Sequence, residues 1–108
     1  MHHLIAVTLP IRDNDGSNLD HHHDNLQASL LDIAGGYSSQ AIGGAWRSED
    51  GRVYRDESIR YETLVKVADS ESAYWKIVEV AERIAKESLQ ECLLVTISDG
   101  HIVRYVEG

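Results

Sequence analysis

The sequence predicts an α+β fold in which two helices cover one face of an antiparallel sheet. Two segments repeat apolar residues at helical spacing, and they alternate with short runs that are typical of strands. Asp-Gly pairs separate strand-like runs at two places, which predicts two β-hairpins. The chain has 108 residues, of which 43% are hydrophobic, so we expect one domain over 1–108 with its own core.

The first third of the chain predicts a strand and a helix. The apolar run 4–9 is stopped by Pro10, which is typical of a buried strand. Apolar residues at helical spacing then predict a helix over 19–34, with Asn18 or Asp20 capping its start and a Gly-Gly pair ending it.

A long hairpin follows the first helix. A two-residue turn on the Asp-Gly pair at 50–51 places Trp46 opposite Arg55. The run 53–67 alternates between apolar and polar side chains, which predicts a half-buried antiparallel strand. Fully extended, that run spans about 50 Å. We therefore expect the tip, residues 46–55, to project beyond the helices.

The last third predicts a second helix and a second hairpin. Apolar spacing indicates a helix over 70–89, capped by Asp69. Strands over 92–98 and 101–106 flank a turn on the second Asp-Gly pair, with Cys92 near Glu107. This order of elements fits a ferredoxin-like split β-α-β-β-α-β arrangement with an extra C-terminal strand.

Charge and cysteine content restrict the functional class. The formal net charge is −8 and the isoelectric point is about 5.1, so the chain repels phosphate backbones and anionic membranes. We expect neither nucleic acid nor membrane as a partner. A single cysteine excludes an intramolecular disulfide, and no apolar run is long enough to span a bilayer. We expect a soluble, cytoplasmic protein.

The two hairpins also predict self-association. The tip of the first hairpin carries a tryptophan and projects, and such a surface usually rests on a partner. Both faces of the second hairpin carry large apolar side chains, although the helices can cover only one face. A homo-oligomer would cover the other face, whereas the alternative is a monomer with a largely exposed sheet.

The first hairpin carries the best candidate binding site. Arginine forks bind anions, and aromatic rings stack on planar ligands. The expected register places Arg55 over Trp46 as a cation–π pair. Neighbouring carboxylates can also neutralise these arginines within the chain, which leaves a purely structural alternative. The candidates for contact with a small anionic or aromatic ligand, or with another subunit, are Trp46, Arg47, Tyr54, Arg55, Arg60 and Tyr61.

A histidine cluster suggests a metal site. Imidazole and carboxylate ligands suit zinc, nickel or copper, and the helical spacing lets some of these side chains share a face. The candidate ligands are His21, His23, Asp20 and Asp24. The alternative is a solvated first helical turn whose aspartates interact favourably with the helix dipole.

No catalytic set stands out, and we expect no cofactor. Cys92 and His101 would lie about 20 Å apart along the second hairpin, too far for a nucleophile and its base. The run 98–101 contains Ser, Asp and His but is typical of a turn. The glycine pairs match neither phosphate-binding motif.

Several short motifs resemble a family of small bacterial proteins of unknown function. They lie at 46–47, 51–53, 57–58 and 90–93, and the resemblance spans 46–106. It implies this α+β architecture and no established chemistry. The projecting hairpin is also similar to that of trimeric ferredoxin-like proteins of the divalent-cation tolerance and nitrogen-signalling type.

Three hypotheses about function follow. The first is a homo-oligomeric module without catalysis that binds a ligand or partner around the hairpin 46–61. The second is a small dimeric ferredoxin-like enzyme, such as a cofactor-free oxygenase or a lyase. The third is a transition-metal-binding protein that uses the histidine cluster.

Overall fold

The protein is described by a computed structural model covering residues 2–12, 16–88, 92–97 and 103–107. The residues expected to form the second Asp-Gly turn lie outside this description. The elements are β1 (His2–Pro10), α1 (Asp20–Ala34), β2 (Ser38–Arg47), β3 (Val53–Lys66), the 3-10 turn η1 (Val67–Asp69), α2 (Ser70–Glu87), β4 (Cys92–Ile97) and β5 (Val103–Glu107).

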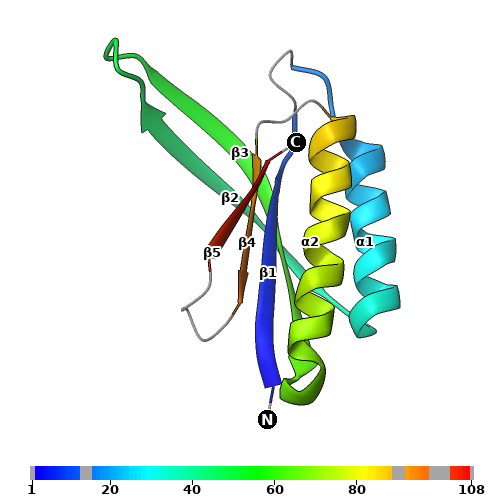
Figure 1. Ribbon diagram of the computed structural model, residues 1–108. Helices are drawn as coiled ribbons and strands as arrows, with labels where there is room; N and C mark the ends of the chain where they lie inside the picture. The colour runs from blue at the N-terminus through cyan, green and yellow to red at the C-terminus, as the bar shows by residue number, and fades with distance from the viewer. Residues whose placement is uncertain (1, 13–15, 89–91, 98–102, 108) are drawn as a thin grey trace.

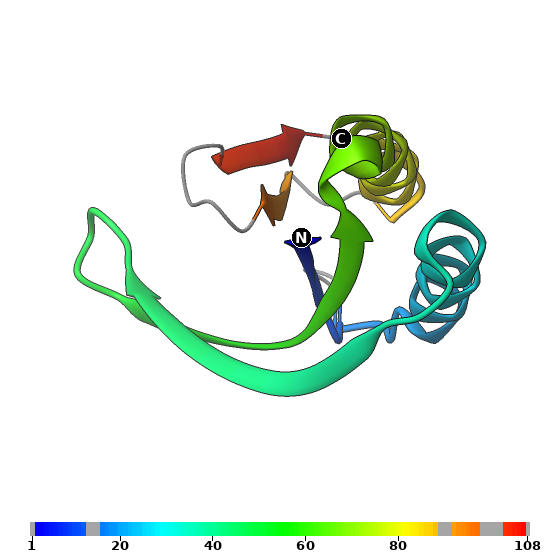
Figure 2. The ribbon, with the colours of Figure 1, turned by 90° about the horizontal axis from the view of Figure 1, so that it is seen from below.

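The described strands form one antiparallel sheet in the order β2-β3-β1-β4-β5. β3 lies between β1 and β2, which makes the split β-α-β arrangement. Both helices lie on one side of the sheet (Figures 1 and 2). The predicted ferredoxin-like fold with an extra C-terminal strand is confirmed. The register of the second hairpin also agrees, because Cys92 pairs with Glu107.

The core lies between the helices and the centre of the sheet. Alternate side chains of β1 point toward the helices, and both helices present an apolar stripe to them. The most deeply buried members are Ile5, Val7, Leu9, Leu26, Leu30, Ile77, Ala81, Ile84 and Val95. Tyr61 of β3 joins this cluster at its edge.

The glycine that ends α1 follows the prediction, whereas the starts of both helices differ from it. Gly35 has φ +82° and donates its N–H to the carbonyl of Leu31, which ends α1 in the left-handed conformation that glycine favours. Leu19, rather than the predicted Asn18 or Asp20, occupies the N-cap of α1, and its side chain makes no capping hydrogen bond. The Asn18 side chain accepts a hydrogen bond from the Asp20 N–H at 3.4 Å. Asp69 precedes α2, but its side chain makes no capping hydrogen bond. The preceding 3-10 turn gives Asp69 near-helical backbone angles, which differ from the extended angles of a capping residue.

The first hairpin lies one residue away from the predicted register. Its loop has three residues rather than two, because Ser48 pairs with Arg52, and Gly51 within it takes a positive φ of +87°. The Asp50 carboxylate accepts hydrogen bonds from the Arg52 N–H and the Ser48 hydroxyl, which closes this wider loop. Trp46 therefore lies opposite Tyr54 rather than the predicted Arg55.

The hairpin projects beyond the helices as expected (Figure 1). β1 pairs with β3 only as far as Ser58, so residues 43–57 form a two-stranded ribbon, here called the arm. Viewed from below, β2 and β3 curve away from the helices (Figure 2). Every residue of β2 except the half-buried Ile42 is exposed. The fold thus leaves both faces of the arm uncovered.

Two neighbouring leucines on α1 test this description of the core. Leu30 is 1% exposed and Leu31 is 51% exposed. We expect Leu30→Ala to lower the free energy of unfolding by about 2–5 kcal/mol, because it removes packed methyl groups and leaves a cavity. Leu31→Ala carries the same change in helix propensity, and we expect it to lower the free energy of unfolding by less than about 1 kcal/mol. Urea unfolding of both variants measures the difference, and equal losses would contradict this orientation of α1.

Candidate functional site

Two aromatic rings stack near the tip of the arm. The ring centroids of Trp46 and Tyr54 are 4.7 Å apart with an interplanar angle of 19°. These residues are 53% and 40% exposed, respectively. The stack replaces the predicted cation–π pair of Trp46 with Arg55, because the register differs by one residue. It makes a flat apolar surface on a ribbon that lacks other support.

The six residues of the predicted arginine–aromatic site are divided between the two faces of the hairpin. Trp46, Tyr54 and Arg60 occupy positions of one parity, while Arg47, Arg55 and Tyr61 occupy the other. On the face away from the helices, Arg60 forms an ion pair with Glu62 at 2.9 Å. A ligand role for these residues stays a prediction, and a single small ligand cannot contact all six.

Tyr61 lies in a hydrogen-bonded cluster that the sequence did not reveal. Its side-chain oxygen is 2.7 Å from Nδ1 of His23 and 3.1 Å from Nε2 of Gln27. Nε2 of His23 lies 2.8 Å from the carbonyl oxygen of Pro10. A carbonyl only accepts hydrogen bonds, so a neutral imidazole here carries its proton on Nε2. Its Nδ1 then accepts the hydrogen bond that the Tyr61 hydroxyl donates. The Gln27 amide then donates to the Tyr61 oxygen.

The environment of Tyr61 keeps its hydroxyl protonated near neutral pH. Burial raises the pKa of Tyr61 above its usual value, and nearby Tyr37 and Asp24 act in the same direction. The hydrogen bond from Gln27 opposes this shift. Tyr61 is therefore a neutral polar group in this structure and can both donate and accept hydrogen bonds.

A cavity of about 460 Å³ opens beside this cluster, where α1 faces β2 and β3. It is lined by Ile11, Asp20, His23, Asp24, Gln27, Ser39, Ile59 and Tyr61. Two lining side chains are carboxylates and none is Lys or Arg. Its volume falls within the range of small-molecule sites. The cavity combines apolar walls, neutral hydrogen-bonding groups and negative charge.

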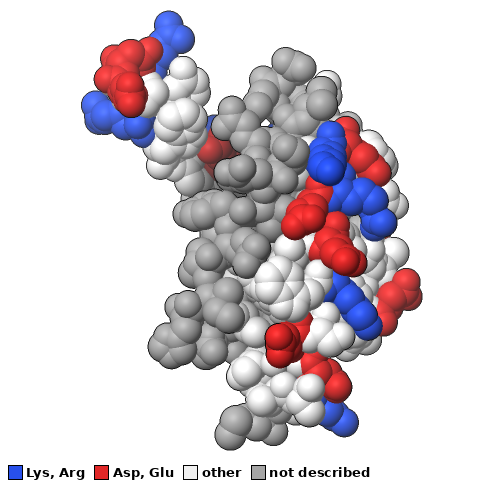
Figure 3. Space-filling model, viewed as in Figure 1, with Lys and Arg blue, Asp and Glu red and all other residues white. Residues whose placement is uncertain are grey.

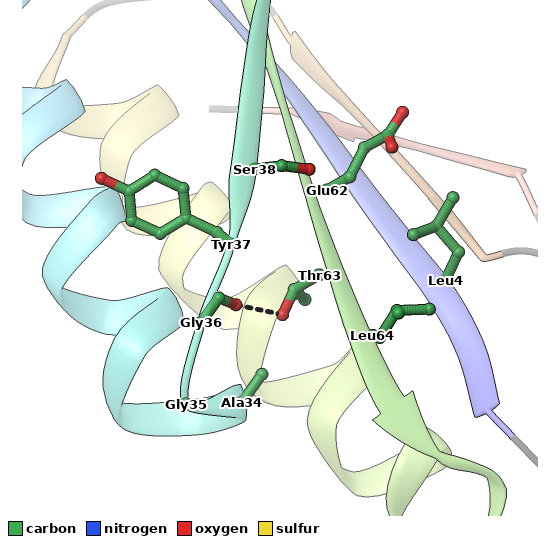
Figure 4. Close-up of a pocket in the computed structure, with 9 residues that line it drawn as sticks. All are labelled: Leu4, Ala34, Gly35, Gly36, Tyr37, Ser38, Glu62, Thr63 and Leu64. Carbon is green, nitrogen blue, oxygen red and sulfur yellow. Dashed lines mark hydrogen bonds between the residues drawn. The ribbon is translucent and has the colours of Figure 1, made fainter.

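A second cavity, of about 550 Å³, lies at the connection between α1 and β2 (Figure 4). Its lining residues are Leu4, Ala34, Gly35, Gly36, Tyr37, Ser38, Glu62, Thr63 and Leu64. The Thr63 hydroxyl donates to the carbonyl of Gly36 within it. In Figure 4, Tyr37 points toward the helices, whereas Leu4 and Glu62 lie on the other side of β3. The polar groups of this hollow do not converge, so it is the weaker candidate.

The predicted metal ligands lie along the first turns of α1. His21 is exposed, and the two ring nitrogens of His23 already contact Tyr61 and Pro10. Within the described ranges, no three His, Cys, Asp or Glu side chains are placed to hold one metal ion. Metal binding through Nδ1 of His23 would displace the Tyr61 hydroxyl, while Nε2 could keep its contact with the carbonyl of Pro10. The metal hypothesis stays a prediction, and a metal at His23 would have to replace a hydrogen bond of the folded protein.

Known structures confirm the fold. No protein-family model and no curated protein sequence matches the chain. A phage SAM lyase solved in complex with S-methyl-5'-thioadenosine superimposes with a TM-score of 0.70 at 15% identity, over 99% of this chain and 90% of that one. The periplasmic divalent cation tolerance protein CutA from Archaeoglobus fulgidus gives a TM-score of 0.54 at 14% identity, over 78% and 72%. The GlnK–ATP complex from B. subtilis gives a TM-score of 0.52 at 13% identity, over 97% of this chain and 84% of that one.

These similarities are to the fold. The chain is a small ferredoxin-like protein, and the expected architectural similarity to divalent-cation tolerance proteins is confirmed. In the part of the chain that the structure describes, no helix is long and apolar enough to cross a membrane. The predicted cytoplasmic location stays a prediction. The Cys92 side chain and residues 98–101 lie outside the description, so the expected separation of Cys92 from His101 also stays a prediction.

His22 gives a pH-dependent test of this region. Burial lowers the pKa of His22, and the neighbouring His21 adds to the effect. In the unfolded chain His22 binds a proton near pH 6.5, whereas in the folded chain it binds that proton only at a lower pH. Stability is therefore lost as the pH falls from 6.5 toward the lowered folded-state pKa. The wild-type Tm should fall when the pH is lowered from about 7.5 to about 5.5. We expect this fall to be smaller by a few degrees in His22→Gln.

The control for this test is His2→Gln, at an exposed position in β1 that does not contribute to the lowered pKa of His22. We expect this variant to keep the wild-type fall in Tm. Calorimetry of the three proteins at both pH values decides the matter. If His22→Gln loses as much stability on acidification as the wild type, the burial of His22 does not govern this response.

Proposed function

We propose that the chain is a self-associating, non-catalytic module that binds a small ligand carrying an adenosyl group. The observation that carries the proposal is the arm, whose two faces are both uncovered although it presents a stacked Trp46–Tyr54 pair. An isolated two-stranded ribbon is marginally stable in water. Contact with a partner would stabilise this conformation.

A second copy of the chain is the partner that best accounts for the exposed surface. Apolar side chains stand out from the arm at Trp46, Val53 and Tyr54, and from the open face of the sheet at Leu64. Gly44 has no atom within 4 Å of where a Cβ would lie, so another backbone can approach there. A closed homo-oligomer would bury these patches together.

Charge supports the prediction that neither nucleic acid nor an anionic membrane is a partner. The chain carries a formal net charge of −8. Lys and Arg are interspersed with Asp and Glu over the helices and at the tip of the arm (Figure 3). Phosphate backbones are bound by concentrated basic surfaces, which this distribution does not provide on the face drawn.

The ligand class is inferred from the compared structures and from charge. Two of them hold adenosine-bearing ligands, S-methyl-5'-thioadenosine and ATP. The cavity at Tyr61 has carboxylates and no Lys or Arg in its lining, so a triphosphate would be repelled there. An adenosyl thioether or sulfonium compound fits better. The small anionic ligand expected from the arginines of the arm is therefore the weaker alternative.

A SAM lyase activity is the second candidate. Its support is the superposition on the phage SAM lyase, which extends over nearly the whole of both chains. Release of S-methyl-5'-thioadenosine breaks a carbon–sulfur bond of the sulfonium and returns the electron pair to sulfur, so the positive charge on sulfur disappears. The carbon that loses sulfur is bonded instead by the substrate's own carboxylate oxygen, or a neighbouring carbon gives up a proton to form a double bond, so neither route needs a second reactant. Carboxylates beside that charge stabilise the bound substrate more than the transition state. This argument favours binding over cleavage.

Two tryptophans test the role of the arm. We expect the wild-type protein to have a mass in light scattering that is a multiple of 12.1 kDa. Trp46→Ala removes half of the aromatic stack, and we expect it to weaken self-association at least about tenfold. Trp75→Ala, at an exposed position on α2, is the matched control and should retain the wild-type mass. A wild-type monomer at micromolar concentration would refute the self-association.

Incubation with SAM separates binding from cleavage. We expect SAM at about a hundred times its Kd to raise Tm by about 10–12 °C, because the ligand binds only the folded chain. We also expect SAM to remain intact by chromatography and mass spectrometry. Accumulation of S-methyl-5'-thioadenosine would support the lyase instead. If neither SAM nor S-methyl-5'-thioadenosine raises Tm, the adenosyl ligand class is wrong.

A further inference from the structure

We propose that the cavity beside Tyr61 is a binding site for an organic cation, and that Asp20 and Asp24 make it select a sulfonium over a neutral thioether. This inference rests on the adenosyl ligand class proposed above. It adds the location of the site and the chemical feature that the site recognises.

The two carboxylates lie on the same side of α1. Asp20 and Asp24 are four residues apart, about one helical turn, and both line the cavity. Both residues are exposed. Among the residues that the structure describes, neither forms an ion pair. Their charge therefore faces the cavity and solvent without a basic partner in the described chain.

The rest of the cavity lining contains no Lys or Arg to offset them. Tyr61 is held as a protonated hydroxyl, and Gln27 is a neutral amide. Both ring nitrogens of His23 are engaged, one by Tyr61 and one by the carbonyl of Pro10. The two negative side chains therefore line the cavity beside a hydrogen-bonded cluster of Tyr61, His23 and Gln27.

An organic cation fits this lining better than a metal ion does. Transition metals prefer several converging ligands, and the imidazole nitrogens of His23 are already engaged. A sulfonium carries its charge on a centre surrounded by carbon, so it can bind near carboxylates without direct coordination. Ile11 and Ile59 supply apolar contact for that carbon, and the Tyr61 ring can stabilise a nearby cation.

A pair of ligands isolates the effect of charge. SAM and S-adenosylhomocysteine share the adenosyl group and the amino-acid group, and they differ by one methyl and one positive charge. We expect the wild-type protein to bind SAM several-fold more tightly, and at most about 25-fold, since each of the two exposed ion pairs contributes up to about fivefold. Raising the salt concentration should reduce this preference, because exposed charges are screened.

Matched variants locate the selectivity. We expect Asp20→Asn combined with Asp24→Asn to remove the preference for SAM while leaving the affinity for S-adenosylhomocysteine within about twofold. Asp32→Asn, at an exposed position on the same helix outside the cavity lining, is the control and should retain the wild-type preference. Tyr61→Phe removes the hydroxyl that contacts His23 and Gln27 in the cavity lining, and it should weaken the binding of both ligands. Titration calorimetry measures each Kd, and circular dichroism verifies folding.

The outcomes distinguish this inference from the proposed function. Equal affinities of the wild type for the two ligands would overturn cation selection while leaving adenosyl binding in place. A SAM preference that survives in the double aspartate variant would place the site elsewhere and overturn the inference. If neither ligand binds the wild type, the proposed ligand class fails and this inference fails with it, whereas self-association is judged separately by light scattering.

Discussion

The extent of helical cover over the sheet determines what the rest of the structure exposes. The 15-residue α1 and the 18-residue α2 span about 22 Å and about 27 Å. The 14-residue β3 spans about 46 Å. The helices therefore enclose the centre of the sheet and leave β2 and the arm bare. The same mismatch opens the cavity where α1 faces β2, so both candidate functional regions follow from one limit on packing.

The order of the elements was predictable because its signals are local. Apolar spacing, the glycine that ends α1 and the alternation along β3 each act within a few residues. The register of the first hairpin was not predictable from the Asp-Gly pair alone. The type I′ turn that an Asp-Gly pair favours needs positive φ at both central positions. Here the Asp50 carboxylate instead accepts hydrogen bonds from Ser48 and Arg52, and Gly51 has a positive φ. The hydrogen bonds of the Asp50 side chain thus outweighed the preference of the Asp-Gly pair for a two-residue turn, and every cross-strand partner in the hairpin changed.

The candidate site was less accessible from the sequence. The predicted cluster ignored strand alternation, which by itself separates Arg60 from Tyr61. The contact between His23 and Tyr61 joins residues 38 positions apart, so only tertiary packing brings them together. One weak signal was present, since His23 and Gln27 are four residues apart on a helix and can face the same neighbour. The histidine cluster drew attention to metal chemistry, although the ring of His23 serves as an internal hydrogen-bonding link.

The three-residue loop of the arm also has a consequence for how lineages of such chains would diverge. Side chains alternate along a strand, so a substitution that favours the two-residue turn on 50–51 would slide β2 by one position against β3 and reverse which way each β2 side chain points. Trp46 would then leave the side of the ribbon that Tyr54 occupies. Paralogues that differ by this one step in register would present unlike surfaces and sort into separate assemblies while keeping the same core.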